Sequence, residues 1–278
     1  MKNVNKSLSK REKRMERNKN CMVFTILFIG LLSFSSSTYA QNSGFVAAQD
    51  NTACETNWNY DYIQNVPPIM MRDPLIEMLG QTNDPIPYYY EEAVKITGHS
   101  CQVVASAWMI TRLALEQLYP NGEVPVRGQI KIEMPGAEDE WNIGVYGEVM
   151  AYVTGATTKN GFSGSVFAKG NPLTIRRNKM VYTENPVGTP PPKMKWIFTR
   201  LDNNKSVTGS WNITLVQPKT DEKVLKEIGN KVASGTATPE ELAEFHKNWN
   251  AAAVFILENA ETVDGLITIG TLEDQTDK

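Results

Sequence analysis

The sequence has few of the side chains from which catalytic and metal centres are usually assembled. Its 278 residues include only two histidines and three cysteines. It also lacks the common catalytic signatures: there is no His-Glu-x-x-His, no Gly-x-Ser-x-Gly, no Walker loop and no Cys-x-x-Cys-His haem motif. These absences exclude the protease, hydrolase, nucleotide-binding and haem-binding classes that the motifs mark. The chain has no internal repeat and only one long apolar run.

That apolar run, Cys21 to Phe34, follows a basic N-terminal arm. Residues 1–20 carry eight Lys or Arg and two acids, and the run ends in small polar residues ahead of Thr38-Tyr39-Ala40. Because the run is short for a membrane span, the order predicts a secretory signal peptide over residues 1–40, cut after Ala40, and a periplasmic or secreted protein. The length of the basic arm leaves an uncleaved N-terminal anchor as the alternative.

Charge narrows the expected partners of the mature chain. Of 28 basic and 31 acidic residues, eight and two lie in the predicted signal, which leaves 20 against 29 and a net charge of −9. This balance argues against a nucleic acid or an anionic membrane as partner and is compatible with a bound cation. With the signal removed, we expect no membrane contact.

Export would leave Cys54 and Cys101 as the only cysteines, in a compartment that oxidises thiols. One alternative is a disulfide that closes the loop between them, worth roughly 4 kcal/mol in the chain-entropy model. The other is a free Cys101 that can bind a metal. The spacing of the two residues does not decide between these alternatives.

The pattern predicts an α+β protein in three segments after the signal: a polar arm over 41–72, an α+β core over 73–216, and a C-terminal helical hairpin with a tail over 217–278. In the core, the pattern predicts a buried helix from Cys101 to Tyr119. A strand over Val124–Met134 and a helix over Trp141–Val153 are expected to follow. The helices are expected on one side of the sheet. Further strands are predicted at Gly161–Phe167, Leu173–Ile175, Lys179–Thr183, Lys195–Arg200 and Ser206–Val216.

Helix ends are the clearest local signals. Asp73-Pro74 is expected to start a short helix that stops at Gly80. Thr238-Pro239-Glu240-Glu241 is a complete capping box before an apolar-faced helix, with a partner helix over Thr220–Ser234. Leu266 to Ile269 is expected to add a last edge strand.

The junction Gly98-His99-Ser100-Cys101 carries the most chemistry. It sets an imidazole and a thiol two residues apart at the start of the long helix. His and Cys bind zinc-like ions, and a helix N-terminus stabilises a thiolate. The junction therefore predicts a metal corner. By contrast, His246 is expected on the surface, Met70-Met71 in packing, and Arg176-Arg177 as a solvated pair.

Three stretches occur in a distinctive order: Glu91 to Cys101 at the helix junction, Thr154-Gly155-Ala156-Thr157, and Gly235 to Leu242 before the last helix. In that order they resemble the His-Gly-His-x-Cys-Pro-Gly run, the Thr-Gly-Cys-Thr run and the helical hairpin of the FmdE family, which takes its name from a component of formylmethanofuran dehydrogenase. The resemblance covers roughly Pro87 to Ile269.

The resemblance implies an FmdE-like core of helix, strand, helix and three strands in a mixed sheet, a bound divalent metal, most often zinc, and a homodimer. His99 and Cys101 carry over as ligands. The family's aspartate ahead of Thr-Gly-Cys-Thr corresponds by spacing to Glu148, which becomes the third candidate ligand. The chain departs from the family where Thr97 replaces the first His and Ala156 replaces the later Cys.

Three classes of function remain open from the sequence. The first is an exported metal-binding protein with an open coordination position for a small ligand. The second is an enzyme in which the metal activates water or Cys101 acts as nucleophile. The third is a non-catalytic module held by a Cys54–Cys101 disulfide. Binding ranks above catalysis because the motif contains no general base.

Overall fold

The computed structural model describes residues 56–140, 142–159, 161, 177–183, 193–216 and 220–272. The chain divides into two units, Met1–Asn57 and Trp58–Lys278, and the description below concerns the second. The predicted signal peptide, Cys21, Cys54 and Arg176 lie outside the described residues, as do nearly all of the predicted strand Gly161–Phe167 and the whole of Leu173–Ile175. Among the described helices, none is long and apolar enough to cross a membrane.

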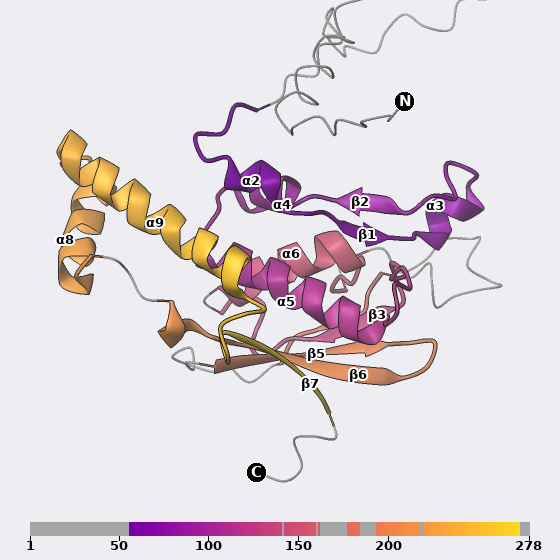
Figure 1. Cartoon of the computed structure of the whole chain (residues 1–278). Coiled ribbons are helices and arrows are strands. Elements are labelled where there is room, and N and C mark those ends of the chain that lie inside the picture. Colours follow the sequence, from indigo (N-terminus) through magenta and orange to yellow (C-terminus); the bar gives the residue numbers. More distant parts are fainter. Residues whose placement is uncertain are drawn as a thin grey trace, which may run out of the picture. The chain divides into compact units, whose positions relative to one another are not determined.

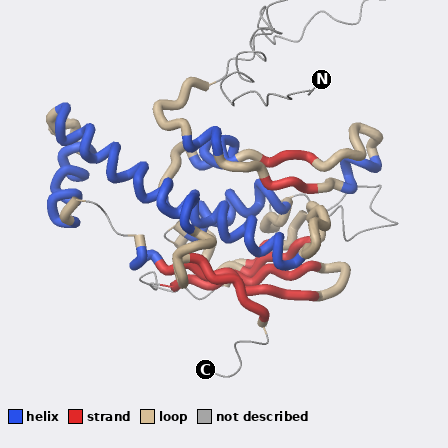
Figure 2. Tube along the Cα trace, viewed as in Figure 1, coloured by secondary structure: helices blue, strands red, loops and turns tan. Residues whose placement is uncertain are grey.

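The described part is an α+β structure, as predicted, with helices packed over one face of a sheet (Figures 1 and 2). The helices are α2 (Tyr62–Asn65), α3 (Pro74–Met78), α4 (Tyr90–Thr97), α5 (Gln102–Leu118), α6 (Ile143–Thr154), α8 (Glu222–Ala233) and α9 (Pro239–Asn259), with a short 3₁₀ turn η2 (Ile213–Leu215). The strands are β1 (Ile69–Met71), β2 (Ile86–Tyr88), β3 (Ile130–Glu133), β4 (Met180–Val181), β5 (Lys193–Arg200), β6 (Lys205–Asn212) and β7 (Ile267–Thr271).

The main sheet is mixed, as expected, with the order β4-β3-β5-β6-β7. β3 and β4 are parallel, and the other neighbours are antiparallel. The predicted edge strand is confirmed as β7, which pairs with β6. β1 and β2 form a separate antiparallel pair.

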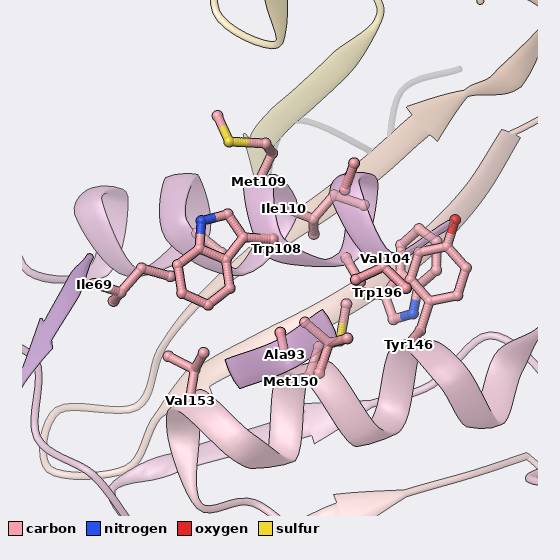
Figure 3. Packing of buried hydrophobic residues seen from close by; sticks show 14 of the residues in the cluster. Ile69, Ala93, Val104, Trp108, Met109, Ile110, Tyr146, Met150, Val153 and Trp196 are labelled. Carbon is pink, nitrogen blue, oxygen red and sulfur yellow. The ribbon is translucent and has the colours of Figure 1, made fainter. Parts of the chain in front are cut away.

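The core lies between α5, α6 and the sheet. α5 is apolar on nearly every side and buries twelve of its seventeen residues. Figure 3 shows Val104 and Trp108 of α5 facing Met150 and Val153 of α6, with Trp196 of β5 nearby. On β6, a Cβ on Gly209 would lie 2.6 Å from Cγ2 of Ile110, so only glycine allows α5 to approach the sheet this closely.

The local helix signals are confirmed. Asp73 accepts a hydrogen bond from the Leu75 N–H at 3.0 Å and caps α3. At α9, the Glu241 N–H donates to Thr238 Oγ1 at 3.2 Å, and the Thr238 N–H donates to Glu241 Oε2 at 2.9 Å. Both halves of the capping box are therefore formed.

The segment boundaries differ from the expectation at both ends. Residues from Trp58 onward belong to the folded unit, because Ile63, Ile69 and Met71 are buried in its core. The polar arm therefore ends before α2 and does not reach residue 72. At the C-terminus, α9 buries Ile256 against the core and β7 joins the sheet, so residues 220–272 pack with the same unit.

Candidate functional site

The corner at residues 98–101 joins the C-terminus of α4 to the N-terminus of α5. Gly98 ends α4 in the left-handed conformation, with φ of 76°, and Cys101 precedes α5 as its N-cap with an extended backbone. The left-handed turn requires glycine and redirects the chain between the two helices. The backbone therefore bends sharply at the His99-Ser100-Cys101 stretch.

His99 is exposed and held in a defined orientation. Its Nδ1 lies 3.0 Å from the Thr97 carbonyl oxygen, which can only accept a hydrogen bond. The proton therefore sits on Nδ1, and the Nε2 lone pair is left for a ligand or a proton. The ring packs at 6.3 Å, centroid to centroid, against Trp249 of α9.

Ser100 anchors the corner to three helices. Its buried Oγ accepts a hydrogen bond from the Tyr62 hydroxyl of α2 at 2.9 Å and lies 2.8 Å from the Tyr90 hydroxyl of α4. Its carbonyl oxygen accepts a hydrogen bond from Trp249 Nε1 of α9 at 2.8 Å, and the Tyr62 hydroxyl also reaches Asn250 Oδ1 at 2.9 Å. These contacts fix the backbone on both sides of His99.

Sequence reasoning missed the four aromatic and amide side chains around Ser100. Tyr90 belongs to a run of three tyrosines that indicates only a helix start, and Asn250 is a polar residue in an apolar-faced helix. A polar position on the buried face of a predicted helix is the one signal that could have found Asn250. Burial raises the pKa of Tyr62 and of Tyr90, so both phenols stay protonated as donors.

Cys101 lies beneath the corner and is 7% exposed. Burial raises the pKa of its thiol, and the nearby backbone N–H groups of Val104 and Val103 offset only part of that rise. The expectation of a thiolate at the helix N-terminus is therefore wrong for the protein without a ligand. Loss of hydration raises the pKa of the thiol by more than the helix N-terminus lowers it. The thiol is free, and Cys54, its partner in the disulfide alternative, lies outside the described residues.

Glu148 is exposed on α6, in the neighbourhood of Tyr182. Burial, followed by the charges of Glu138 and Glu148, raises the pKa of the Tyr182 phenol to about 12. Among the described residues, no group of three or more His, Cys, Asp or Glu side chains lies close enough to hold a metal ion. The described part thus supplies His99 and Cys101 at one corner and places Glu148 beside Tyr182.

The other singled-out residues fall as follows. His246 is exposed on α9, as expected, and Met71 is fully buried in packing. Ala156, where the family has a cysteine, is fully buried and offers no ligand atom. The expectation of a solvated Arg177 is wrong: it is 6% exposed and bonded to Asp73, a partner far away in the sequence that no local pattern reveals.

Comparisons with known protein families and curated proteins found no match. No protein-family model matches the chain, and no curated protein matches its sequence. The function is therefore argued from the corner itself.

Proposed function

We propose that this chain is an exported metal-binding protein of FmdE type, in which His99 and Cys101 hold a zinc-like divalent ion. The observation that carries the proposal is the bond between His99 Nδ1 and the Thr97 carbonyl. A carbonyl or carboxylate on the second ring nitrogen is the usual outer-shell partner of a metal-ligating histidine, because it fixes the tautomer and the ring orientation.

The buried Cys101 thiol makes the proposed binding strongly dependent on pH. A metal must displace the thiol proton, and burial holds that proton more tightly than in an exposed cysteine. The backbone N–H groups of Val103 and Val104 lower the pKa of this thiol and would stabilise the metal thiolate. Affinity should therefore rise steeply as pH increases.

Two ligands from one corner leave at least two positions of a tetrahedral ion to be filled. Water or a small ligand can take one position, and Glu148 or a second copy of the chain can supply another. A homodimer is supported by the apolar surface around His99, where Ile96 is 50% exposed and Trp249 is 45% exposed. In this arrangement the metal would lie at the contact between the two copies.

Catalysis is the second candidate, with a metal-bound water or Cys101 as the reacting group. The raised pKa of the Cys101 thiol opposes its use as a free nucleophile. A metal-activated water would need a general base, and the corner contains none besides His99 itself. Metal binding therefore ranks first.

Cobalt titration of the full, metal-stripped chain tests the proposal. Cobalt bound to a thiolate gives a near-ultraviolet charge-transfer band, so the spectrum reports Cys101 directly. We expect one ion per chain, with binding abolished in both His99→Ala and Cys101→Ala, weakened in Glu148→Gln and unchanged in His246→Ala. Full cobalt binding in both His99→Ala and Cys101→Ala would overturn the proposal. A peptide disulfide between Cys54 and Cys101 in the non-reduced protein would instead support the structural alternative.

A further inference from the structure

A second polar cluster, independent of the His99 corner, lies at the C-terminus of α6. Arg177 Nη2 donates to both oxygens of Asp73, at 2.7 and 2.8 Å, and the two side chains are 7% and 3% exposed. Arg127 Nη1 reaches the same carboxylate at 3.3 Å. Two guanidinium groups thus share one carboxylate.

Gly155 brings the two arginines together. It ends α6 with φ of 73°, and a Cβ there would lie 3.0 Å from Cδ of Arg177 and 3.1 Å from Cγ of Arg127. Both side chains therefore cross directly over this glycine. Arg127 also donates to the carbonyl oxygens of Tyr152 at 3.2 Å and Val153 at 3.3 Å. Its charge is thus partly balanced by the C-terminal end of the α6 dipole.

Of the two arginines, Arg127 is the one that can bind an additional acceptor. All three of its bonds are 3.2 to 3.3 Å long, at the weak end of the range, and its side chain is 23% exposed. A guanidinium carries five N–H groups, so two of them have no partner in the part of the chain that is described. An incoming acceptor could use both of these groups without breaking the cluster.

Tyr88 places its hydroxyl, a further hydrogen-bond donor, and its aromatic ring beside Arg127. The guanidinium carbon lies 5.3 Å from the centroid of the Tyr88 ring, which packs edge-on against Tyr152 at 5.1 Å. Within the described residues, the Tyr88 hydroxyl has no hydrogen-bond partner. Burial raises the pKa of this phenol; the charges of Arg127 and Arg177 lower it, and those of Asp73 and Glu92 raise it. The hydroxyl therefore lies near both arginines and both carboxylates.

We infer that Arg127 and the Tyr88 hydroxyl form a binding site for a small organic carboxylate. The planar fork of a guanidinium matches two carboxylate oxygens, and its positive charge attracts the anion. A phosphate dianion fits less well, because Glu92 accepts a hydrogen bond from the Tyr152 hydroxyl beside the site and would repel a second negative charge. The site lies beside the N-terminus of α4, whereas His99 follows the C-terminus of that helix.

Acetate is the probe for this site, titrated into the full chain at constant ionic strength and followed by calorimetry. The substitution Arg127→Gln removes the fork, and we expect the dissociation constant for acetate to rise at least about tenfold. Tyr88→Phe keeps the ring and the fold but removes the hydroxyl, and should weaken binding roughly threefold to tenfold. Arg112→Gln is the matched control, because Arg112 is also 23% exposed and pairs with Glu116 elsewhere on the surface.

Saturable acetate binding that weakens in Arg127→Gln and Tyr88→Phe but not in Arg112→Gln supports the site. The inference is overturned by no saturable binding, by equal binding in all three variants, or by phosphate binding more tightly than acetate at neutral pH. Since no metal is added, the result is independent of the proposed metal corner: loss of cobalt binding with intact acetate binding would reject only the proposed function.

Discussion

The hydrogen bonds of Ser100 offer the sharpest test of how the corner is held. Replacing Ser100 with alanine removes the only hydroxyl recorded within hydrogen-bond distance of the Tyr90 hydroxyl among the described residues, 2.8 Å away. Tyr62 keeps its second acceptor, Asn250 Oδ1 at 2.9 Å, but Tyr90 is fully buried and has no other hydrogen-bond partner among the described residues. A buried donor left without an acceptor costs about 1–3 kcal/mol, so we expect Ser100→Ala to lower the free energy of unfolding by that amount.

A double-mutant cycle isolates the cause of this loss. Tyr90→Phe alone should cost about 1 kcal/mol, because Ser100 keeps its bond from Tyr62. The double variant lacks the Tyr90 hydroxyl, which Ser100→Ala alone would leave unpaired. The loss in the free energy of unfolding should therefore be clearly smaller than the sum of the losses in the two single variants. Urea denaturation followed by tryptophan fluorescence measures all four proteins. Additive costs, or an unchanged midpoint in Ser100→Ala, would refute the reasoning.

Three other parts of the chain lead to testable expectations. Thr238→Ala should lower the free energy of unfolding by about 1 kcal/mol in urea denaturation, because it removes the acceptor for the Glu241 N–H, and an unchanged midpoint would contradict this. Burial raises the pKa of the Cys101 thiol in the folded protein above its ordinary value of 9.0. Below about pH 9 the thiol is neutral in both states, but above it the thiol ionises more readily in the unfolded chain, which lowers the free energy of unfolding. The metal-free chain should therefore lose stability above about pH 9 more steeply than Cys101→Ala, and parallel pH profiles would argue against a buried thiol. N-terminal sequencing of exported protein should begin at Gln41, whereas an intact Met1 would reject the signal peptide.

The two sites share a structural element. α4 begins directly after Tyr89, next to the Tyr88 side of the carboxylate site, and ends at Gly98, next to His99. The helix is held by Glu92, which accepts hydrogen bonds from the Tyr89 N–H and the Tyr152 hydroxyl, and by its first residue, Tyr90, whose hydroxyl is hydrogen-bonded to Ser100 beyond the C-terminus. One helix therefore adjoins both the proposed carboxylate site and the His99 corner.

Features that depend on neighbours in the sequence were predictable from the sequence alone. The caps at Asp73 and Thr238 and the glycine at position 98 act through backbone groups within four residues, so the helix starts and stops follow from local chemistry. The order of the described helices and strands from α4 onward and the edge position of β7 follow from periodicity and turn residues, whereas α2, β1 and β2 were not predicted. The adjacency of His99 and Cys101 is likewise a property of the sequence.

Strand lengths were less predictable, because a strand extends only as far as its partner does. The predicted strand over Val124–Met134 is formed only at Ile130–Glu133, since Gly128 turns the backbone with φ of 82° just before the sheet begins. The predicted strand over Ser206–Val216 ends at Asn212, whose side chain caps a 3₁₀ turn.

Only the tertiary structure decided the state of the charged and polar groups. Arg177 is buried because Asp73, 104 residues away in sequence, meets it in the fold. The Cys101 thiol is held neutral because packing removes water from it, although its position at a helix start suggests the opposite. Glu148 faces Tyr182 because α6 lies beside β4. Hydration and long-range partners set these properties, and a local pattern of residues contains neither.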